Sequence, residues 1–328
     1  MGYTDKEMKR IVLDFIDGMR IGEPVLHEAF RVFPLIAKQP QAAVENQARL
    51  KTVKEALEEG LLLIQETGTV GHLLFVNQSK EHKILVLAGE IVKGGAQNRV
   101  VNVNLIIDEG ATVQVPTSCV EMGRWDRFDA PFTTAEHKVS PSVFSELNRS
   151  VTWNLRYSGG QARYSDQRGI WDKVEEILAD SDAQNPTSDL GALFMKKDRK
   201  TYETLHSVLK NLRAQGAVGV LAESDGRWIA EINDREEIAR VHIPKALESF
   251  MVEALQSTRR RPADEEKVRS RNMGDPTRIL ESLAKGPFEP FDSGPDALEI
   301  RLDRKDAGGS GLIYSGRLVH LSVAGGAA

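Results

Sequence analysis

Apolar residues recur at intervals of three and four in several segments, which is the period of an amphipathic helix. Residues 5–17 form the first such segment, and Gly18 follows them as a stop signal. Two helices are expected within 140–181, where Ser140 before Pro141, and later Asp166, can cap helix starts. Further helices are predicted at 199–214 and 244–257. Helical periodicity therefore dominates the middle of the chain.

Between residues 24 and 119 the apolar runs are short and rich in Val, Ile and Leu, with Gly, Asn and Asp between them. This pattern is typical of β-strands, and one helix near 53–59 interrupts the predicted sheet. Two more strands flank a turn at residues 224–226, where Gly226 supplies a positive φ. The last strands are predicted at 297–302, 311–315 and 317–323. The sequence thus predicts a sheet that begins early and resumes near the end.

These elements predict an α+β fold with a β-rich N-terminal lobe, a helical connector and a smaller C-terminal α+β lobe. The polar stretch SDAQNPTSD, residues 181–189, is the best linker candidate. The predicted domains are therefore 1–185, carrying the candidate site, and 190–328, packed as one unit with the first. The C-terminal part holds the clearest helix, with Asp275 as N-cap, Pro276 at the first position and Gly286 past the end. The mixed-charge run 259–271 is interpreted as a solvated connector in preference to a phosphate-binding patch.

Charge and composition narrow the class of partner. Forty-three Lys and Arg against 48 Asp and Glu give a net charge of -5, so there is no general electrostatic reason to bind nucleic acid or an anionic membrane. The apolar runs are much shorter than the roughly 20 residues that span a bilayer. A single cysteine, Cys119, excludes an intrachain disulfide. We therefore expect a cytoplasmic protein without a membrane or general nucleic-acid partner.

Strict alternation between residues 101 and 117 predicts a hairpin with its turn at Asp108–Gly110. Antiparallel pairing about that turn places Val103 opposite Val115 and Leu105 opposite Val113. Alternate residues then share one mostly apolar face, and polar residues occupy the other. The polar face consists of Asn102, Asn104, Thr112, Gln114 and Ser118.

The same register places charged residues at the open end of the hairpin, on the core face. It pairs Arg99 with Cys119 and Gln97 with Glu121. Buried charges must be paired, hydrogen-bonded or solvated in a recess. Glycine-containing turns at 94–95 and 123 meet this end, and they fit close approach by a ligand or tight chain reversal equally well. The sequence thus predicts a polar pocket on an apolar floor.

Candidate roles follow from the chemistry of these side chains, although each has a structural alternative. Glu121 and Glu90 are the candidate catalytic carboxylates. Glu121 could instead form a structural ion pair with Arg99 or Arg124, and Cys119 could be a buried small residue. Trp125 could stack a planar group or simply cover the core. The candidate ligand-binding residues are Gln97, Asn98, Arg99, Cys119, Arg124 and Trp125.

Familiar catalytic motifs are missing from the sequence. It lacks GxGxxG after a strand, GxxxxGK[ST], HExxH and GxSxG, so dinucleotide, P-loop, zincin and α/β-hydrolase interpretations have no support. No metal site is predicted, and a metal held by Glu90 and Glu121 would be a hard cation. The sequence indicates neither a cofactor nor an oligomeric state.

Two segments, GEIVKGGAQNRVV and VPTSCVEMGRW, resemble the domain family named for its association with ADP-ribosylglycohydrolase and rhodanese-phosphatase proteins, abbreviated ARPP. The resemblance extends over nearly the full chain through EPVLHEAFRVFPL, GAVGVLAESDGRWIAEI and GSGLIYSGRLVHL. The family name implies a setting of ADP-ribose or nucleotide metabolism but no mechanism.

Two functions are compatible with the sequence and this resemblance. The first is a hydrolase or transferase acting on an ADP-ribose-like or nucleotide-derived substrate, with Arg99 and Arg124 holding phosphate and Glu121 or Glu90 as acid or base. The second is a non-catalytic module whose pocket binds a small nucleotide-like ligand or a partner peptide. A carboxylate poised beside a reacting group would favour the enzyme, whereas one locked by an arginine would favour the binding module.

Overall fold

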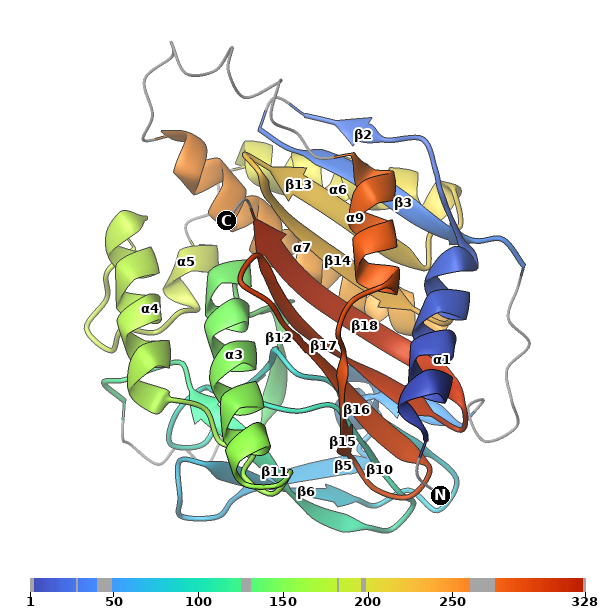
Figure 1. The fold of residues 1–328 in the computed structure, drawn as a ribbon. Coiled ribbons are helices and arrows are strands. Elements are labelled where there is room, and N and C mark those ends of the chain that lie inside the picture. Colours follow the sequence, from blue (N-terminus) through green and yellow to red (C-terminus); the bar gives the residue numbers. More distant parts are fainter. Residues whose placement is uncertain are drawn as a thin grey trace. The chain divides into compact units, whose positions relative to one another are not determined.

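The computed structural model describes residues 3–27, 29–39, 49–124, 131–181, 183–195, 199–259 and 275–326. Within these residues it contains eight helices and eighteen strands, which confirms the α+β class (Figure 1). The chain forms two compact units that are interleaved in sequence. Unit 1 comprises Met1–Gln41, Lys197–Pro290 and Ile300–Ala328, and unit 2 comprises Ala42–Lys196 and Phe291–Glu299. The division into residues 1–185 and 190–328 remains a prediction.

Unit 1 is organised around a nine-stranded sheet with the order β1-β3-β13-β14-β18-β17-β16-β15, in which β2 pairs with β3 beside this path. The chain passes between the units within β15 and again within β16. The strands are β1 (Met19–Ile21), β2 (Val25–Leu26), β3 (Arg31–Ala37), β13 (Gly219–Ser224), β14 (Arg227–Asn233), β15 (Glu289–Asp292), β16 (Ala297–Asp303), β17 (Ala307–Tyr314) and β18 (Arg317–Gly326).

Helices cover both faces of this sheet. Helices α1 (Asp5–Asp17) and α9 (Pro276–Ala284) pack on each other on one face, and α6 (Arg199–Ala214) and α7 (Glu236–Arg259) lie on the other (Figure 1). The bounds of α1 and α6 confirm the predicted helices. The predicted start at Pro244 is wrong, because α7 begins at Glu236 and contains Pro244. An interior proline costs an isolated helix about 3 kcal/mol, and here the packing of α7 on β13 and β14 offsets that cost.

The structure confirms most of the predicted helix caps and turns. The Asp275 side chain accepts a hydrogen bond from the Thr277 amide at 2.9 Å and caps α9. The turn between β13 and β14 has positive φ at both Asp225 and Gly226. Ser140 occupies the N-cap position of the helix that begins at Pro141, yet its side chain makes no capping hydrogen bond. Its role as a cap is therefore positional only.

The described residues of unit 2 form two smaller sheets and four helices. A three-stranded sheet has the order β10-β7-β4, and a six-stranded sheet has the order β12-β8-β9-β11-β6-β5. The strands are β4 (Leu50–Thr52), β5 (Leu62–Glu66), β6 (His72–Asn77), β7 (Lys83–Val86), β8 (Glu90–Lys93), β9 (Arg99–Val101), β10 (Leu105–Ile107), β11 (Thr112–Cys119) and β12 (Thr133–Lys138). The helices are α2 (Val53–Glu58), α3 (Pro141–Tyr157), α4 (Gln167–Asp180) and α5 (Ala192–Met195). One apolar core joins both sheets through residues such as Phe75, Val86, Val101 and Val115.

The predicted hairpin is correct at its open end and wrong near its turn. Strand β11 pairs with β9 so that Cys119 faces Arg99, as the register predicts. Nearer the turn the two arms join different sheets, with Leu105 opposite Val86 of β7 and Val113 opposite Phe75 of β6. Apolar residues do alternate along both arms, but near the turn each arm pairs with a different strand and not with the other arm.

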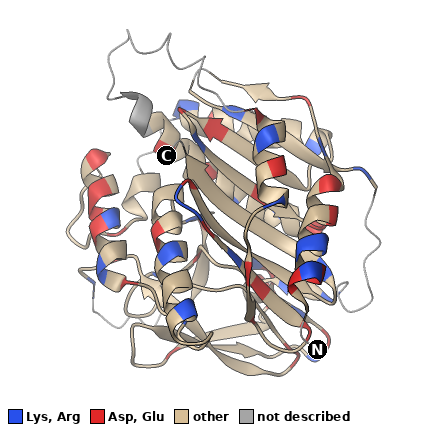
Figure 2. Ribbon diagram, viewed as in Figure 1, with Lys and Arg blue, Asp and Glu red and all other residues tan. Residues whose placement is uncertain are grey.

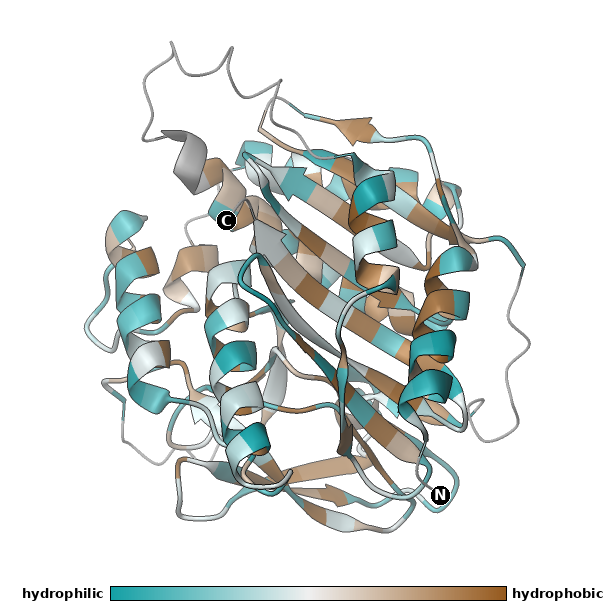
Figure 3. Ribbon diagram, in the orientation of Figure 1, coloured by the Kyte–Doolittle hydropathy of each residue, from teal (hydrophilic) through white to brown (hydrophobic). Residues whose placement is uncertain are grey.

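Charged residues of both signs lie along the outer sides of the helices, whereas most strand positions are uncharged (Figure 2). Brown and teal alternate along many strands, as expected when one side of a strand is buried (Figure 3). Within the described residues, no helix combines the length and the apolar character needed to cross a membrane.

Candidate functional site

The open end of the β9–β11 pair brings the predicted polar residues together. Glu121 lies two residues after β11, Asn98 directly precedes β9, and residue Glu121 is 4% exposed. Its Oε2 atom accepts hydrogen bonds from the Asn98 amide at 3.1 Å and from Arg124 Nε at 2.9 Å. Arg124 Nη2 lies 2.8 Å from the same oxygen. Of the alternatives for Glu121, the structure shows the ion pair with Arg124.

The Arg124 guanidinium is also bound by two other protein groups. Nη1 donates to the Gly95 carbonyl at 2.9 Å, and Nη2 donates to Asn98 Oδ1 at 3.2 Å. Arg124 thereby ties the end of β11 to the turn that precedes β9. A guanidinium held in this way has few donors left for a phosphate.

Arg99 is held in the same manner and is 2% exposed. Its Nε donates to the Val70 carbonyl at 3.2 Å, and its Nη1 donates to the Gln97 carbonyl at 3.0 Å and to Gln97 Oε1 at 3.3 Å. Glu66, at the end of β5, lies 3.4 Å from Nη2. Glu66 is not among the residues predicted for the site, because the alternating pattern of its strand does not indicate a partner 33 positions away in the chain.

Other parts of the protein lie directly beside the two glycine turns. Gly95 has φ +55°, and a Cβ there would collide with the carboxylate of Glu66. A Cβ on Gly123 would lie 2.8 Å from the Thr187 Cα and 3.0 Å from the Pro186 carbonyl oxygen. Gly123 therefore requires glycine because backbone atoms occupy the space beside it, whereas Gly95 favours glycine mainly because of its positive φ.

The chain that approaches Gly123 is the loop of residues 183–191, which we call the docked loop. Gly123 donates to the Thr187 carbonyl at 2.8 Å, and Leu190 donates to the Val120 carbonyl at 3.1 Å. Asn185 organises the loop internally, since its Oδ1 accepts from the Asp189 amide at 2.9 Å and its Nδ2 donates to the Asp189 carbonyl at 3.1 Å. Such side-chain turns are typical of Asn, so the NPTSD sequence carried a signal for ordered structure.

Asp189, in the docked loop, is a carboxyl group that the sequence analysis did not select. Burial raises its pKa, and the nearby charge of Glu121 acts in the same direction. The Gly191 amide at 3.0 Å and the Asn98 side-chain amide at 3.3 Å both donate to Oδ1 and oppose that shift. Asp189 is therefore a partly buried acid with an elevated pKa beside the Glu121–Arg124 pair.

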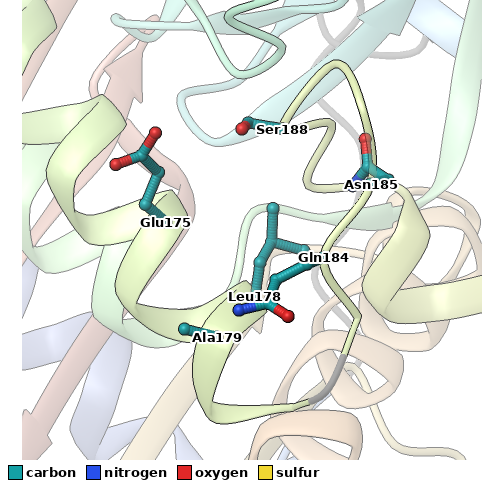
Figure 4. A pocket seen from close by; sticks show the side chains of 6 residues that line it. All are labelled: Glu175, Leu178, Ala179, Gln184, Asn185 and Ser188. Carbon is teal, nitrogen blue, oxygen red and sulfur yellow. The ribbon is translucent and has the colours of Figure 1, made fainter.

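A cavity of about 300 Å³ lies between the outer side of the docked loop and α4. Figure 4 shows Glu175 of α4 across the opening from Ser188, with Leu178 and Gln184 on the lower side of the opening in this view. Ala179 and Asn185 complete the lining. Carboxylate, amide and hydroxyl groups over a leucine can bind hydroxyl groups or a cation, and the lining contains no cationic side chain.

Cys119 is fully buried, and its Sγ lies 2.9 Å from the Glu121 carbonyl oxygen. Burial raises the pKa of this thiol, which disfavours the nucleophilic thiolate. Gln167 of α4 brackets the Cys119 backbone with two hydrogen bonds of 2.8 Å, one accepted from the amide and one donated to the carbonyl. Cys119 therefore lies in a packed environment that α4 holds in place.

The structure thus gathers six of the eight candidates: Gln97, Asn98, Arg99, Cys119, Glu121 and Arg124. Glu90 is fully buried on β8, where its cross-strand partner is Lys138 of β12. Trp125 lies outside the described residues. No cluster of three or more potential His, Cys, Asp and Glu metal ligands occurs in the described part of the chain.

A second buried polar group in unit 2 also escaped the sequence analysis. Glu299 is fully buried, and its Oε1 accepts from the Asn104 amide at 2.9 Å and from the Asn104 side chain at 3.1 Å. Arg163 Nη1 donates to Oε2 at 3.2 Å. The partners are separated by 195 and 136 positions in the chain, which sequence spacing does not reveal.

Comparison with known proteins adds one finding. The model of the ARPP-1 family, described as the ARG and Rhodanese-Phosphatase-superfamily-associated Protein domain, matches residues 18–324. No curated protein and no solved structure matches the chain. The match includes the β9–β11 end, the docked loop and most of both units, and it confirms the resemblance inferred from the central motif. The chain therefore belongs to the ARPP-1 domain family, which is associated with ADP-ribosylglycohydrolase and rhodanese-phosphatase proteins.

Proposed function

We propose that this chain is a non-catalytic module that binds the sugar part of an ADP-ribose-like or other nucleotide-derived ligand. The observation that carries the proposal is the state of Glu121. Its carboxylate is held by Arg124 and by the Asn98 amide, which favours the binding module over the enzyme. A general acid or base must instead reach the proton that it transfers.

The site that supports binding is the cavity beside the docked loop. Its volume of about 300 Å³ is at the lower end of the range for ligand pockets, so it suits one sugar or one nucleoside portion of a larger molecule. Glu175, Gln184 and Ser188 supply acceptors and donors for hydroxyl groups, and Leu178 supplies an apolar surface. The Glu175 carboxylate would repel a phosphate, so a phosphate group would extend toward solvent.

The family association fits a ligand of this chemistry without naming it. The sequence predicts that Arg99 and Arg124 contact phosphate, but in this proposal they have a structural role. They hold the strand ends on which the docked loop rests, and the loop in turn forms one wall of the cavity. The predicted site residues would then act as supports for the binding residues.

One observation favours the enzyme alternative. Burial raises the pKa of Asp189, and its side chain is only partly buried, which makes it a second candidate for a proton-transferring carboxyl group. In that case Asp189, and not Glu121, would transfer the proton. Asp189→Asn separates the two functions, because it should leave a pure binding module active and abolish turnover by an enzyme.

The test combines calorimetric titration with ribose, adenosine, ADP and ADP-ribose and chromatographic analysis of products after long incubation. We expect saturable binding of at least one sugar-containing ligand without product. Glu175→Ala should weaken that binding at least tenfold, whereas Glu176→Ala should not, because the neighbouring Glu176 carboxylate is engaged by Lys173 at 2.7 Å. Failure of all four ligands to bind, or turnover that Asp189→Asn abolishes, would contradict the proposal.

A further inference from the structure

The docked loop lies between the end of β11 and the cavity shown in Figure 4. On its inner side, Gly123 donates to the Thr187 carbonyl at 2.8 Å, and Leu190 donates to the Val120 carbonyl at 3.1 Å. On its outer side, the loop supplies Ser188 and two further residues to the lining of the cavity (Figure 4). The shape of the cavity therefore depends on how firmly the loop is docked.

Docking of the loop brings two carboxyl groups together. Glu121 and Asp189 are partners in an antiparallel β-bridge, and directly opposed residues place their side chains on the same side. Arg124 Nη2 lies 2.8 Å from Glu121 Oε2, whereas Asp189 forms no salt bridge with a Lys or Arg in the part of the chain that the structure describes. The arginine at this bridge therefore neutralises Glu121 and not Asp189.

Asn98 keeps the two carboxyl groups close to each other. Its backbone amide donates to Glu121 Oε2 at 3.1 Å, and its side-chain Nδ2 donates to Asp189 Oδ1 at 3.3 Å. The Gly191 amide also donates to Asp189 Oδ1, at 3.0 Å. These neutral donors fix the Asp189 carboxyl group but leave its charge uncompensated when it ionises. An ionised Asp189 in the docked loop is therefore both partly desolvated and repelled by Glu121.

We propose that the docked loop is a pH-sensitive gate of the cavity, which is closed while the Asp189 carboxyl is protonated and loosens when it ionises. The gate rests on the proposed function in one respect, that the cavity is the binding site. Burial and the charge of Glu121 both raise the pKa of Asp189 in the docked state, as such a gate requires. The equilibrium constant for docking therefore falls as the pH rises from about 4 through the raised pKa, because the undocked carboxyl loses its proton more readily.

The other charged or titratable groups around the loop differ from Asp189 in their position. Lys93 of β8 opposes the rise in the pKa of Asp189, and Glu175 of α4 lies on the outer side of the loop, in the cavity. His137 of β12 stacks on Phe194 of α5, just after the loop, with ring centroids 3.4 Å apart. The variant Asp189→Asn retains these groups and has the shape of the neutral acid, so it isolates the contribution of the Asp189 charge.

Hydrogen–deuterium exchange of the ligand-free full chain, analysed by mass spectrometry, measures the docking of the loop directly. The Leu190 amide is the reporter, because its hydrogen bond to the Val120 carbonyl breaks when the loop undocks. After correction for the intrinsic exchange rate, we expect its protection factor to fall at least about threefold from about pH 4 to about pH 7. Peptides from β6 report the stability of the unit as a whole and provide the reference.

Two variants separate Asp189 from a general effect of pH. In Asp189→Asn the protection factor of the loop should be the same at both pH values. Glu176→Gln is the matched control, since it removes a carboxylate that pairs with Lys173 on α4, and it should keep the fall seen in the parent. Circular dichroism verifies that each variant is folded. A constant protection factor in the parent would overturn the proposal, as would an equal fall in Asp189→Asn.

Binding of ribose and adenosine tests the connection between the loop and the cavity, because neither molecule titrates between about pH 5 and about pH 7. Calorimetric titration of the parent should give an affinity that falls over this range in step with the protection of the loop, and Asp189→Asn should bind equally well throughout. An affinity that is constant while the protection changes would show that the loop is not a gate. If neither molecule, nor ADP or ADP-ribose, binds while the exchange behaves as expected, the proposed function is contradicted and the pH-sensitive docking is supported.

Discussion

Substitution of Glu121 by Gln tests whether the carboxylate at the end of β11 is a structural partner. The change removes the negative charge and keeps the side-chain length and one oxygen acceptor. In the parent, Glu121 Oε2 receives three donors, the Asn98 amide and two atoms of Arg124. In the variant, Arg124 would face a neutral amide, one of whose groups is itself a donor.

The expected cost can be bounded from the geometry. Breaking a fully buried ion pair by removing one partner costs about 3–5 kcal/mol. The Arg124 side chain is 18% exposed and keeps its bonds to Gly95 and Asn98, so the penalty should be smaller. A net loss of about 2–3 kcal/mol is consistent with charged hydrogen bonds of this kind. For a unit of this size that lowers the melting temperature by roughly 4–12 °C.

Urea denaturation followed by circular dichroism measures the free energy of unfolding directly. Glu176→Gln is the matched control, because its exposed pair with Lys173 should contribute at most about 1 kcal/mol. A double-mutant cycle with Arg124→Gln isolates the pair, and we expect a coupling energy above about 1 kcal/mol. A Glu121→Gln variant that is as stable as the parent, with coupling near zero, would refute the assignment of Glu121 as a structural partner.

Three further predictions concern single groups. Folding raises the pKa of Asp189 and so favours its neutral form, which means that this group lowers the free energy of unfolding as pH rises from about 4 through the raised pKa. The free energy of unfolding of Asp189→Asn should therefore increase relative to the parent between pH 4 and pH 7. Urea denaturation at both pH values measures this difference, and the absence of a gain would contradict the prediction. Asp275→Ala should lower the free energy of unfolding by about 1 kcal/mol, whereas Ser140→Ala should lower it less because the Ser140 hydroxyl makes no capping hydrogen bond. Equal decreases for the two variants in thermal denaturation would show that the capping hydrogen bond is not the cause. The Cys119 thiol, buried and with a raised pKa, should react with Ellman's reagent only after unfolding, and rapid labelling of the folded chain would contradict its burial.

The sequence by itself determined the local features of this protein. Helix α1 and the cap at Asp275 follow from side-chain spacing and from hydrogen bonds between residues two to four apart. The positive φ at Gly226 follows from a turn of two residues. The family was also readable, because its central motif is contiguous in the chain. All of these signals lie within a short stretch of sequence, where the covalent chain limits the choices.

Only the tertiary structure decided which segments pair over long distances. Alternation between residues 101 and 117 shows that one side of each arm is buried, but it does not identify the covering strand. The arms therefore diverge to β6 and β7, although a simple hairpin satisfies the same pattern. The register at Arg99 and Cys119 could be predicted because pairing continues there.

In the candidate site, too, some contacts could be predicted from the sequence and others depend on the tertiary structure. The predicted strand register placed Asn98 near Glu121, sequence proximity placed Arg124 there, and the hydrogen bonds of both agree. Glu66 and Asp189 reach the same place from 33 and 91 positions away, through the sheet and the docked loop. A buried charge selects its partners by distance and desolvation in three dimensions, which residue spacing does not encode, so the fold decided that Glu121 pairs with Arg124.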